Sequence, residues 1–238
     1  MIVRALAAGW LVVRQADHAR LAAEIVALAR LPEIVESSRR KSILRAVSEH
    51  DNGWWEEDAA PRLDPESGGP LDFRALPAAA RRELWLRAIE RHAAEEPYVA
   101  ALVAGHFLRI APAAALDPGG AELRAAVEHR RLELLESAGV PVEAADDDDR
   151  WLRLGDELSL AAATAEPAMV SSPGWRVEVA ELDNRLELAV EPFPWVGPTT
   201  LALECRRLGR RRFADPVALG TALIAARLER LPVRLVPL

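Results

Sequence analysis

The chain has 238 residues, a formal net charge of −7 and a hydrophobic content of 50%. This composition is that of a globular protein, and its acidity argues against a general nucleic-acid binder. The only cysteine, Cys205, excludes an internal disulfide and a cysteine-based metal site. No apolar run has the length of a membrane span, and the first residues lack the order of a signal peptide, so we expect a cytoplasmic protein.

The first two thirds of the sequence predict a β-hairpin followed by helices. Residues 1–14 carry two β-forming runs around Ala8-Gly9, a pattern typical of a hairpin. Residues 52–77 have no sustained periodicity and are expected to form a long ordered loop, which contains Trp54 and Trp55. Elsewhere apolar residues recur at helical spacing, and the predicted helices span residues 17–31, 37–50, 77–95, 97–110, 121–137 and 146–164.

The last third of the sequence is rich in predicted strands. After Pro167 the apolar residues alternate at period two, and Asp183-Asn184 is the expected turn of a hairpin. The predicted strands span residues 175–181, 186–190, 200–205 and 233–236, with a helix over 215–230 before the last of them. We therefore predict an α+β fold that is mainly α. A helical body over residues 1–165 would begin with the hairpin, and a small β-rich C-terminal subdomain would span residues 166–238.

Five histidine and aspartate side chains share the apolar faces of the predicted helices. His18, for example, precedes Leu21 by three residues and Ile25 by seven, so all three lie on one face. Buried carboxylates need partners, and imidazoles together with carboxylates suit a shared divalent ion. The sequence thus predicts a centre for one or two ions of manganese, iron, zinc or magnesium. Its candidate ligands are His18, His50, Asp51, His106 and Asp156.

Each of these residues also has a structural alternative. A histidine on an apolar face is commonly a hydrogen-bonded core residue, and Asp51 begins an Asp-Asn-Gly sequence typical of a turn. His92, at a helix end among charged residues, is expected at the surface or at the boundary of the core, and His129 in solvent. The ordered recurrence of inward-facing groups on several helices favours the metal centre over these alternatives.

Five segments of the sequence resemble one bacterial family. They are Gln15–Ala19, Glu49–Trp54, Pro70–Phe73, Pro97–His106 and Asp156–Leu160. Together they resemble the domain-of-unknown-function family numbered 3891 along most of the chain, and the hexapeptide Glu49–Trp54 is quite specific. This resemblance implies no activity.

A looser resemblance concerns the order of the candidate ligands. A histidine, a His-Asp pair and a distant helical aspartate are, in that order, the ligands of the HD-domain metal-dependent phosphohydrolases, which are all-helical. In this chain those ligands would be His18, His50, Asp51 and Asp156, and His106 would be the candidate ligand of a second ion. The resemblance implies an HD-like helical bundle, although the hairpin, the tryptophan-rich loop and the C-terminal strands depart from that family.

The first functional hypothesis is a metal-dependent hydrolase of phosphoesters or nucleotides. Asp51 would bridge two ions or orient the attacking water, which makes it the candidate catalytic residue. Arginine pairs with phosphate and tryptophan stacks on rings, so the candidate substrate-binding residues are Trp54, Trp55, Arg20, Arg62 and Arg74.

Two alternatives stay open at this point. One is a non-hydrolytic His/carboxylate metalloprotein, such as an iron oxidase, and the other is a ligand-binding protein without turnover. The sequence has no glycine-rich phosphate loop, nucleophile elbow or dinucleotide fingerprint, which disfavours those enzyme classes. The expected partner is a small phosphorylated molecule rather than a membrane or a nucleic acid, and a homodimer is left open.

Overall fold

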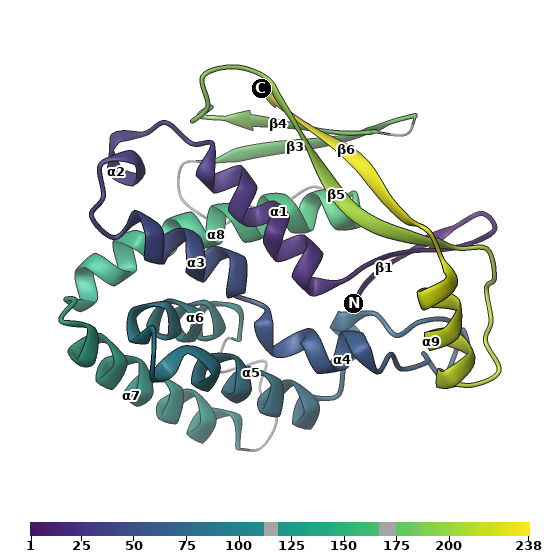
Figure 1. Ribbon diagram of the computed structural model, residues 1–238, viewed down its shortest axis with the longest axis horizontal. Coiled ribbons are helices and arrows are strands. Elements are labelled where there is room, and N and C mark those ends of the chain that lie inside the picture. The colour runs from purple at the N-terminus through teal and green to yellow at the C-terminus, as the bar shows by residue number, and fades with distance from the viewer. Residues whose placement is uncertain (112–118, 167–174, 184) are drawn as a thin grey trace.

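The chain folds into a six-stranded sheet with helices packed against it (Figure 1). This computed structural model describes residues 1–111, 119–166, 175–183 and 185–238. The strand order is β1-β2-β5-β6-β4-β3, and neighbouring strands are antiparallel except for the parallel pair β4 and β6. The strands are β1 (Ile2–Leu6), β2 (Gly9–Val13), β3 (Arg176–Leu182), β4 (Arg185–Glu191), β5 (Thr199–Leu208) and β6 (Leu228–Pro237).

The predicted fold class is wrong. The protein is a mixed α/β structure built on a shared sheet, not a mainly helical HD-like bundle with a small β-rich tail. The N-terminal hairpin joins the C-terminal strands through β2 and β5, where Trp10 lies opposite Leu208 and Val12 lies opposite Arg206. The expected division of the chain at residue 165 stays a prediction.

The helices are α1 (Gln15–Ala27), α2 (Pro32–Val35), α3 (Arg40–Glu49), α4 (Trp55–Ala59), α5 (Ala78–Ala93), α6 (Pro97–Ile110), α7 (Gly120–Ala138), α8 (Val142–Thr164) and α9 (Pro216–Ala225). Helices α1 and α8 pack on one face of the sheet (Figure 1), whereas Leu219 of α9 clusters with Val12 of β2 and Leu208 of β5, whose side chains point to the other face. Residues 52–77 include α4 and two 3₁₀ helices, η1 (Asn52–Trp54) and η2 (Phe73–Ala75). The structure confirms the predicted bounds of α6, whereas α8 begins four residues earlier than expected and α9 ends five residues earlier. Of the predicted turn at Asp183-Asn184, Asn184 lies outside the described residues.

One face of the sheet and the helices α1 and α8 share a single hydrophobic core. Leu188 of β4, Leu203 of β5 and Val233 of β6 are fully buried in it. Trp195, between β4 and β5, donates from its indole nitrogen to the carbonyl oxygen of Ile25 on α1 at 3.0 Å. The sheet therefore covers α1, the helix that carries His18.

Close packing of α1 against α8 depends on a glycine. A Cβ atom on Gly155 would lie 2.9 Å from the carbonyl oxygen of Ala22 and 3.0 Å from side-chain carbons of Val26 and Val47. Only glycine lets the backbones approach this closely. Because Gly155 directly precedes Asp156, this contact sets the distance between Asp156 and the α1 helix.

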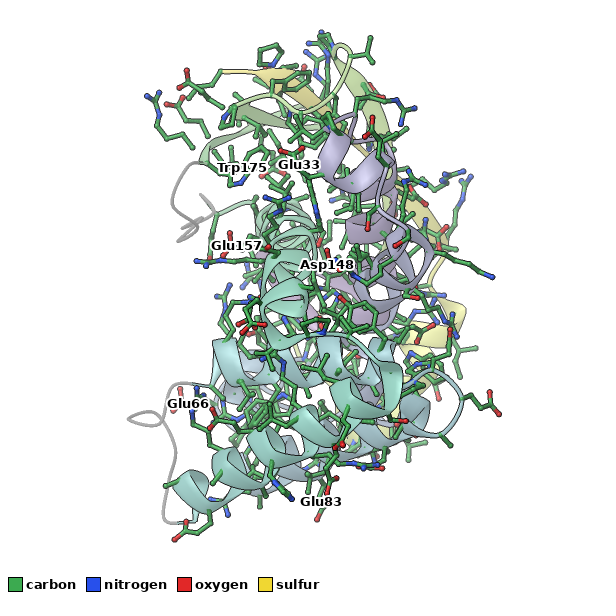
Figure 2. All side chains as sticks on the ribbon, turned by 90° about the vertical axis from the view of Figure 1, so that its left-hand side faces the viewer. Glu33, Glu66, Glu83, Asp148, Glu157 and Trp175 are labelled. Carbon is green, nitrogen blue, oxygen red and sulfur yellow. The ribbon has the colours of Figure 1, made fainter. Side chains whose placement is uncertain are left out.

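A buried polar network joins three helices. Asp148 of α8 accepts hydrogen bonds of 2.6 Å from the Tyr98 hydroxyl on α6 and from Nε of Arg39, the residue before α3. Figure 2 shows Asp148 in the interior, whereas Glu66 and Glu83 lie at the periphery. The network fixes α3, α6 and α8 relative to one another, and these are the helices that position His50, His106 and Asp156.

Among the described residues, no helix combines the length and the apolar character needed to cross a membrane.

Candidate metal centre

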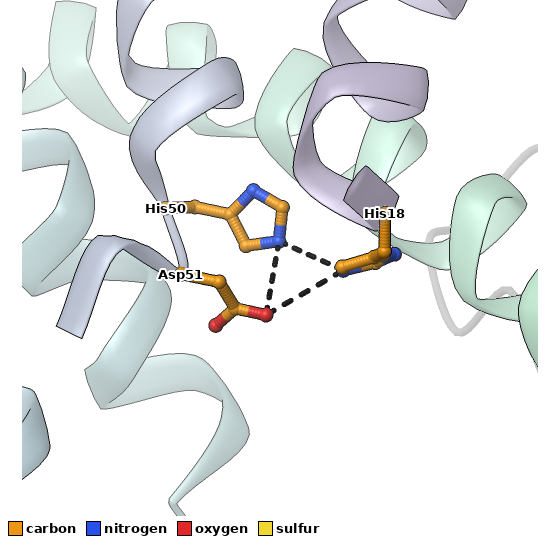
Figure 3. Close-up of side chains that lie close together, drawn as sticks. All are labelled: His18, His50 and Asp51. Atoms are coloured by element: carbon orange, nitrogen blue, oxygen red, sulfur yellow. Dashed lines mark hydrogen bonds and ion pairs between the residues drawn. The ribbon is translucent and has the colours of Figure 1, made fainter. Parts of the chain in front are cut away.

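Two histidines from different helices meet in the interior. His18 lies in the first turn of α1, and His50 directly follows the last residue of α3. Both side chains are buried, and their Nε2 atoms lie 3.1 Å apart. The next residue, Asp51, leaves the helical path and completes a triangle with the two rings (Figure 3).

Hydrogen bonds to the other ring nitrogens fix the tautomers of these two histidines. His50 Nδ1 lies 2.7 Å from the carbonyl oxygen of Val47, which only accepts, so this nitrogen carries a proton. Ser159 Oγ donates its one proton to the carbonyl of Asp156, so His18 Nδ1 donates to Ser159 Oγ at 2.8 Å. In the neutral rings both Nε2 atoms therefore present lone pairs to each other. Facing lone pairs repel unless a cation or a proton lies with them, and such fixed tautomers are characteristic of metal-ligating histidines.

Two aspartates flank this pair of nitrogens. Asp51 Oδ2 lies 3.6 Å from His18 Nε2 and 3.7 Å from His50 Nε2. Asp156 Oδ1, from α8, lies 3.3 Å and 3.4 Å from the same two atoms. Each carboxylate is therefore within reach of a cation that binds both imidazoles.

These distances match the requirements of a divalent ion. The point equidistant from His18 Nε2, His50 Nε2 and Asp51 Oδ2 lies about 2 Å from each atom, which is the length of a metal–nitrogen or metal–oxygen bond. A similar point exists with Asp156 Oδ1 as the third atom. His50, His106 and Asp156 form another group of donors close enough to share an ion. The structure thus has histidine and aspartate groups that could hold a metal ion.

His106 faces the same centre from α6, but its Nδ1 atom already has a partner. Its ring packs edge-to-face against that of His50, with centroids 4.9 Å apart. Arg109, one turn further along α6, donates to His106 Nδ1 at 2.9 Å, because a guanidinium has no acceptor. Arg109 also donates to Asp149 at 3.2 Å and lies 3.9 Å from Asp156 Oδ2. The cation on this side of Asp156 is therefore a guanidinium.

The charge states of the centre follow from burial and mutual attraction. Burial lowers the pKa of His106 well below its usual value and raises the pKa of Asp51. Burial also lowers the pKa of His50. The attraction of the nearby Asp51 and Asp156 carboxylates is stronger than this effect, and it raises the pKa of His50 to about 9. Burial opposes the charge on Asp156 as well, yet His106, His18 and His50 hold its pKa well below the usual range. The centre thus favours positive charge at the nitrogen pair.

A cavity of about 360 Å³ opens onto this centre. His18, Asp51, His106 and Asp156 lie in its wall, while the side chain of His50 is fully buried behind them. The volume is within the range of small-molecule sites. Aromatic and basic side chains line the rest of the cavity, among them Trp54, Phe73, Trp85, Arg74, Arg81 and Arg82.

The chain holds Asp51 in place through the turn that follows it. Asn52 Nδ2 donates to the carbonyl of Glu49 at 2.8 Å and to that of Ala88 on α5 at 3.1 Å. A Cβ atom on Gly53 would lie 2.3 Å from the carbonyl oxygen of Leu84, so only glycine allows η1 to approach α5 this closely. The sequence Asp-Asn-Gly therefore both turns the chain and locks the turn onto α5.

Of the predicted substrate-binding residues, the structure places Trp54 and Arg74 in the cavity wall. Trp54 is 5% exposed, whereas Trp55 is 45% exposed and stacks with Arg91 at 4.4 Å. Arg74 also pairs with Glu166 at 2.9 Å.

The remaining two predicted arginines are engaged outside the cavity wall. Arg20 contacts Glu24 at 2.7 Å and Glu204 at 3.3 Å. Arg62 forms a two-bond pair with Glu57 at 3.0 Å. Neither lies among the described residues that line the cavity.

The two other histidines lie apart from the centre. His92 is buried, with Glu96 at 3.3 Å and Glu49 at 3.6 Å from its ring nitrogens. His129 is 77% exposed beside Glu133, as the sequence predicted.

Several residues of the site were missed in the sequence, and helical spacing could have found three of them. Ser159 lies three residues after Asp156, and Arg109 lies three residues after His106, so each shares a helix face with its ligand. Gln15, whose buried Oε1 has no hydrogen-bond partner among the described residues, lies three before His18 and lines the cavity. Arg81, by contrast, reaches the cavity from a helix with no candidate ligand, so no spacing pointed to it.

Comparison with known proteins gives a family without an activity. The family model described as a protein of unknown function (DUF3891) matches residues 1–210. No curated protein and no solved structure matches the chain.

Proposed function

The chain belongs to the DUF3891 family, and from its own site we propose that it is a metal-dependent hydrolase of phosphoesters that uses one divalent ion. A single observation carries the proposal. Two histidines with fixed tautomers present their Nε2 atoms to each other at 3.1 Å, beside two carboxylates, in the wall of a ligand-sized cavity. A purely structural pair of histidines needs neither the facing lone pairs nor the adjoining cavity.

His18 and His50 would hold the ion, together with Asp51 or Asp156 or both. Two imidazole nitrogens favour zinc, iron(II) or manganese over magnesium, because magnesium prefers oxygen ligands in nearly octahedral geometry. When bound, such an ion supplies Lewis acidity toward a phosphoryl oxygen and lowers the pKa of water that it binds.

The chain's own residues supply orientation and water exclusion. Ser159 and the Val47 carbonyl keep His18 and His50 in the tautomers that leave their Nε2 atoms free. Asp51 lines the cavity and is 14% exposed, so its carboxylate is the group that can orient an attacking water. The aromatic side chains of the wall restrict the access of bulk water.

One ion rather than two is favoured by Arg109. His106 Nδ1 and Asp156 Oδ2 lie 3.7 Å apart, and they are the atoms that could share a second ion on this side of the centre. Arg109 donates to the first atom at 2.9 Å and lies 3.9 Å from the second. A guanidinium therefore supplies the positive charge on that side of Asp156. In this arrangement His106 is not a metal ligand, and its ring packs against that of His50.

Elemental analysis combined with an activity panel tests the proposal. The purified protein should contain about one transition-metal ion per chain, and His50→Ala should lose it. Phosphoester hydrolysis should require zinc, manganese or iron(II), and it should fall to background when the ion is removed with a chelator.

The panel also separates the two alternatives. A bound iron that cycles in redox state without any phosphoester turnover would favour the non-hydrolytic metalloprotein. Ligand binding without metal and without turnover would favour a binding protein. Either result contradicts the hydrolase.

A further inference from the structure

The arginines in the wall of the cavity differ in whether they already have a partner. Arg74 pairs with Glu166 at 2.9 Å, and Arg82 also has an interaction partner. Arg81 lines the same cavity, and among the described residues no side chain forms a hydrogen bond or an ion pair with it. A guanidinium left unpaired in a concave, partly apolar site attracts an anion, because solvent screens the charge less there than on an open surface.

The charge distribution in the wall points in the same direction. The acidic residues that line the cavity, Asp51 and Asp156, belong to the metal centre. Away from that centre, the charged residues in the described part of the wall are Arg74, Arg81 and Arg82. An anionic ligand is therefore complementary to the described part of the wall outside the metal centre.

Apolar rings make up the other part of the wall. Trp54, Phe73 and Trp85 line the cavity, and each packs on another ring that holds it in place. Trp54 and Phe73 have centroids 6.3 Å apart, and Trp85 packs against Phe107 at 4.4 Å. Fixed aromatic walls select a flat apolar group, since little side-chain entropy is lost on binding.

We propose that Arg81 is the anion-binding residue of the cavity and that its ligand is a phosphate or phosphonate group joined to a flat ring. The inference deepens the proposed function and rests on it in treating the cavity as the substrate site. The ligand's anionic group contacts Arg81, and its ring lies against Trp54, Phe73 and Trp85. Arg81 acts here in binding and specificity.

Phenylphosphonate is a suitable probe, because its carbon–phosphorus bond resists hydrolysis and binding can be measured without turnover. Calorimetric titration of the full chain should show that Arg81→Gln binds phenylphosphonate about tenfold or more weakly than wild type, the effect of losing one charge-assisted hydrogen bond. Arg185→Gln, which removes the same charge from an exposed position at the start of β4, should bind like wild type. Because the Arg81 side chain forms no hydrogen bond or ion pair with the residues that the structure describes, its replacement should leave the unfolding temperature unchanged.

A comparison of ligands tests the ring. Methylphosphonate has the same anionic group without the ring, and wild type should bind it about tenfold or more weakly than phenylphosphonate. Equal affinity for the two phosphonates would overturn the assignment of the aromatic wall. Equal affinity of wild type and Arg81→Gln for phenylphosphonate would overturn the role of Arg81.

Repeating the titrations with and without a chelator separates this inference from the proposed function. If binding needs the metal ion and ignores Arg81, the anion is held by the ion, and the inference fails while the metal-dependent function stands. If binding depends on Arg81 in a protein that never holds a metal ion, the inference stands and the proposed function fails.

Discussion

Arg109 donates a hydrogen bond of 2.9 Å to Nδ1 of His106, one helical turn earlier on α6. Under the proposed function, this contact favours one metal ion over two, because it places a positive group on a nitrogen that could otherwise bind a second ion. The nearby Asp149 accepts from the same guanidinium at 3.2 Å and fixes its position.

Removal of Arg109 should therefore change the metal stoichiometry. We expect wild type to bind about one equivalent of zinc or manganese, and Arg109→Ala to bind a second equivalent at higher metal concentration. Equilibrium dialysis with elemental analysis measures both numbers. Arg153→Ala, which removes an arginine of α8 that pairs with Glu157 at 3.0 Å, is the control. Two equivalents on wild type would contradict the one-ion centre.

Ser159 should control metal affinity without being a ligand. Ser159→Ala removes the acceptor that holds the proton on His18 Nδ1, so the ring can adopt the other tautomer or rotate. We expect the dissociation constant of the metal to rise by about 10–100-fold, as is typical when a hydrogen-bond partner of a ligand is lost. Ser48→Ala is a matched control, because Ser48 Oγ also donates to a carbonyl in its own helix, that of Arg45. Equal losses in the two variants would show that the effect is general.

Gly53→Ala should destabilise the turn that carries Asp51. The new Cβ would lie 2.3 Å from the carbonyl oxygen of Leu84, so η1 must move away from α5. We expect a loss of about 1–3 kcal/mol in the free energy of unfolding, measured in denaturant. Gly197→Ala is the control, since its added Cβ would meet no atom within 4 Å. A Gly53 variant as stable as this control would contradict the close approach.

Tyr98 should ionise only when the protein unfolds. Burial and the hydrogen bond to Asp148 raise the pKa of Tyr98 above its usual value. A raised pKa in the folded state means that this stabilisation is complete below the unfolded value of about 10 and is lost as the pH rises toward the folded value. Because Tyr98 is the only tyrosine in the sequence, the ultraviolet absorbance of tyrosinate reports on this residue alone. The absorbance should rise together with the loss of circular dichroism, and tyrosinate formation near the ordinary pKa in an intact fold would refute the prediction.

The tyrosine can also be removed. Tyr98→Phe should lower the free energy of unfolding at neutral pH by about 1.5–3 kcal/mol, because a buried hydrogen bond to a charged carboxylate is lost. The difference in free energy of unfolding between the variant and wild type should shrink as the pH rises above about 10. In that range tyrosine ionises in the unfolded chain, so the hydrogen bond of Tyr98 stabilises the wild-type fold less.

Truncation after residue 165 tests the predicted division of the chain. The shortened protein would lose β5, which pairs with β2, and Trp195, which bonds to Ile25 of α1. We expect it to expose apolar surface, bind a hydrophobic dye and aggregate. A monodisperse truncated protein with a cooperative unfolding transition would show instead that residues 1–165 fold independently.

The sequence alone determined the features that depend on neighbours a few residues away. Helical periodicity predicted α6 residue for residue and placed His18 and Asp156 on inward faces, because residues three and four apart in a helix share a side. The five candidate ligands, named from such faces, lie around one centre in the structure.

The tertiary structure decided which of these faces and strands meet. Alternation at period two marks a strand but does not identify its partner. The sequence therefore could not predict that β2, near the start of the chain, pairs with β5, which lies in its last fifth. The same holds for Arg81, which reaches the cavity only because α5 packs where it does. Periodicity is local, whereas sheet order and the walls of a cavity arise from contacts between distant segments, which form only when the whole core is buried.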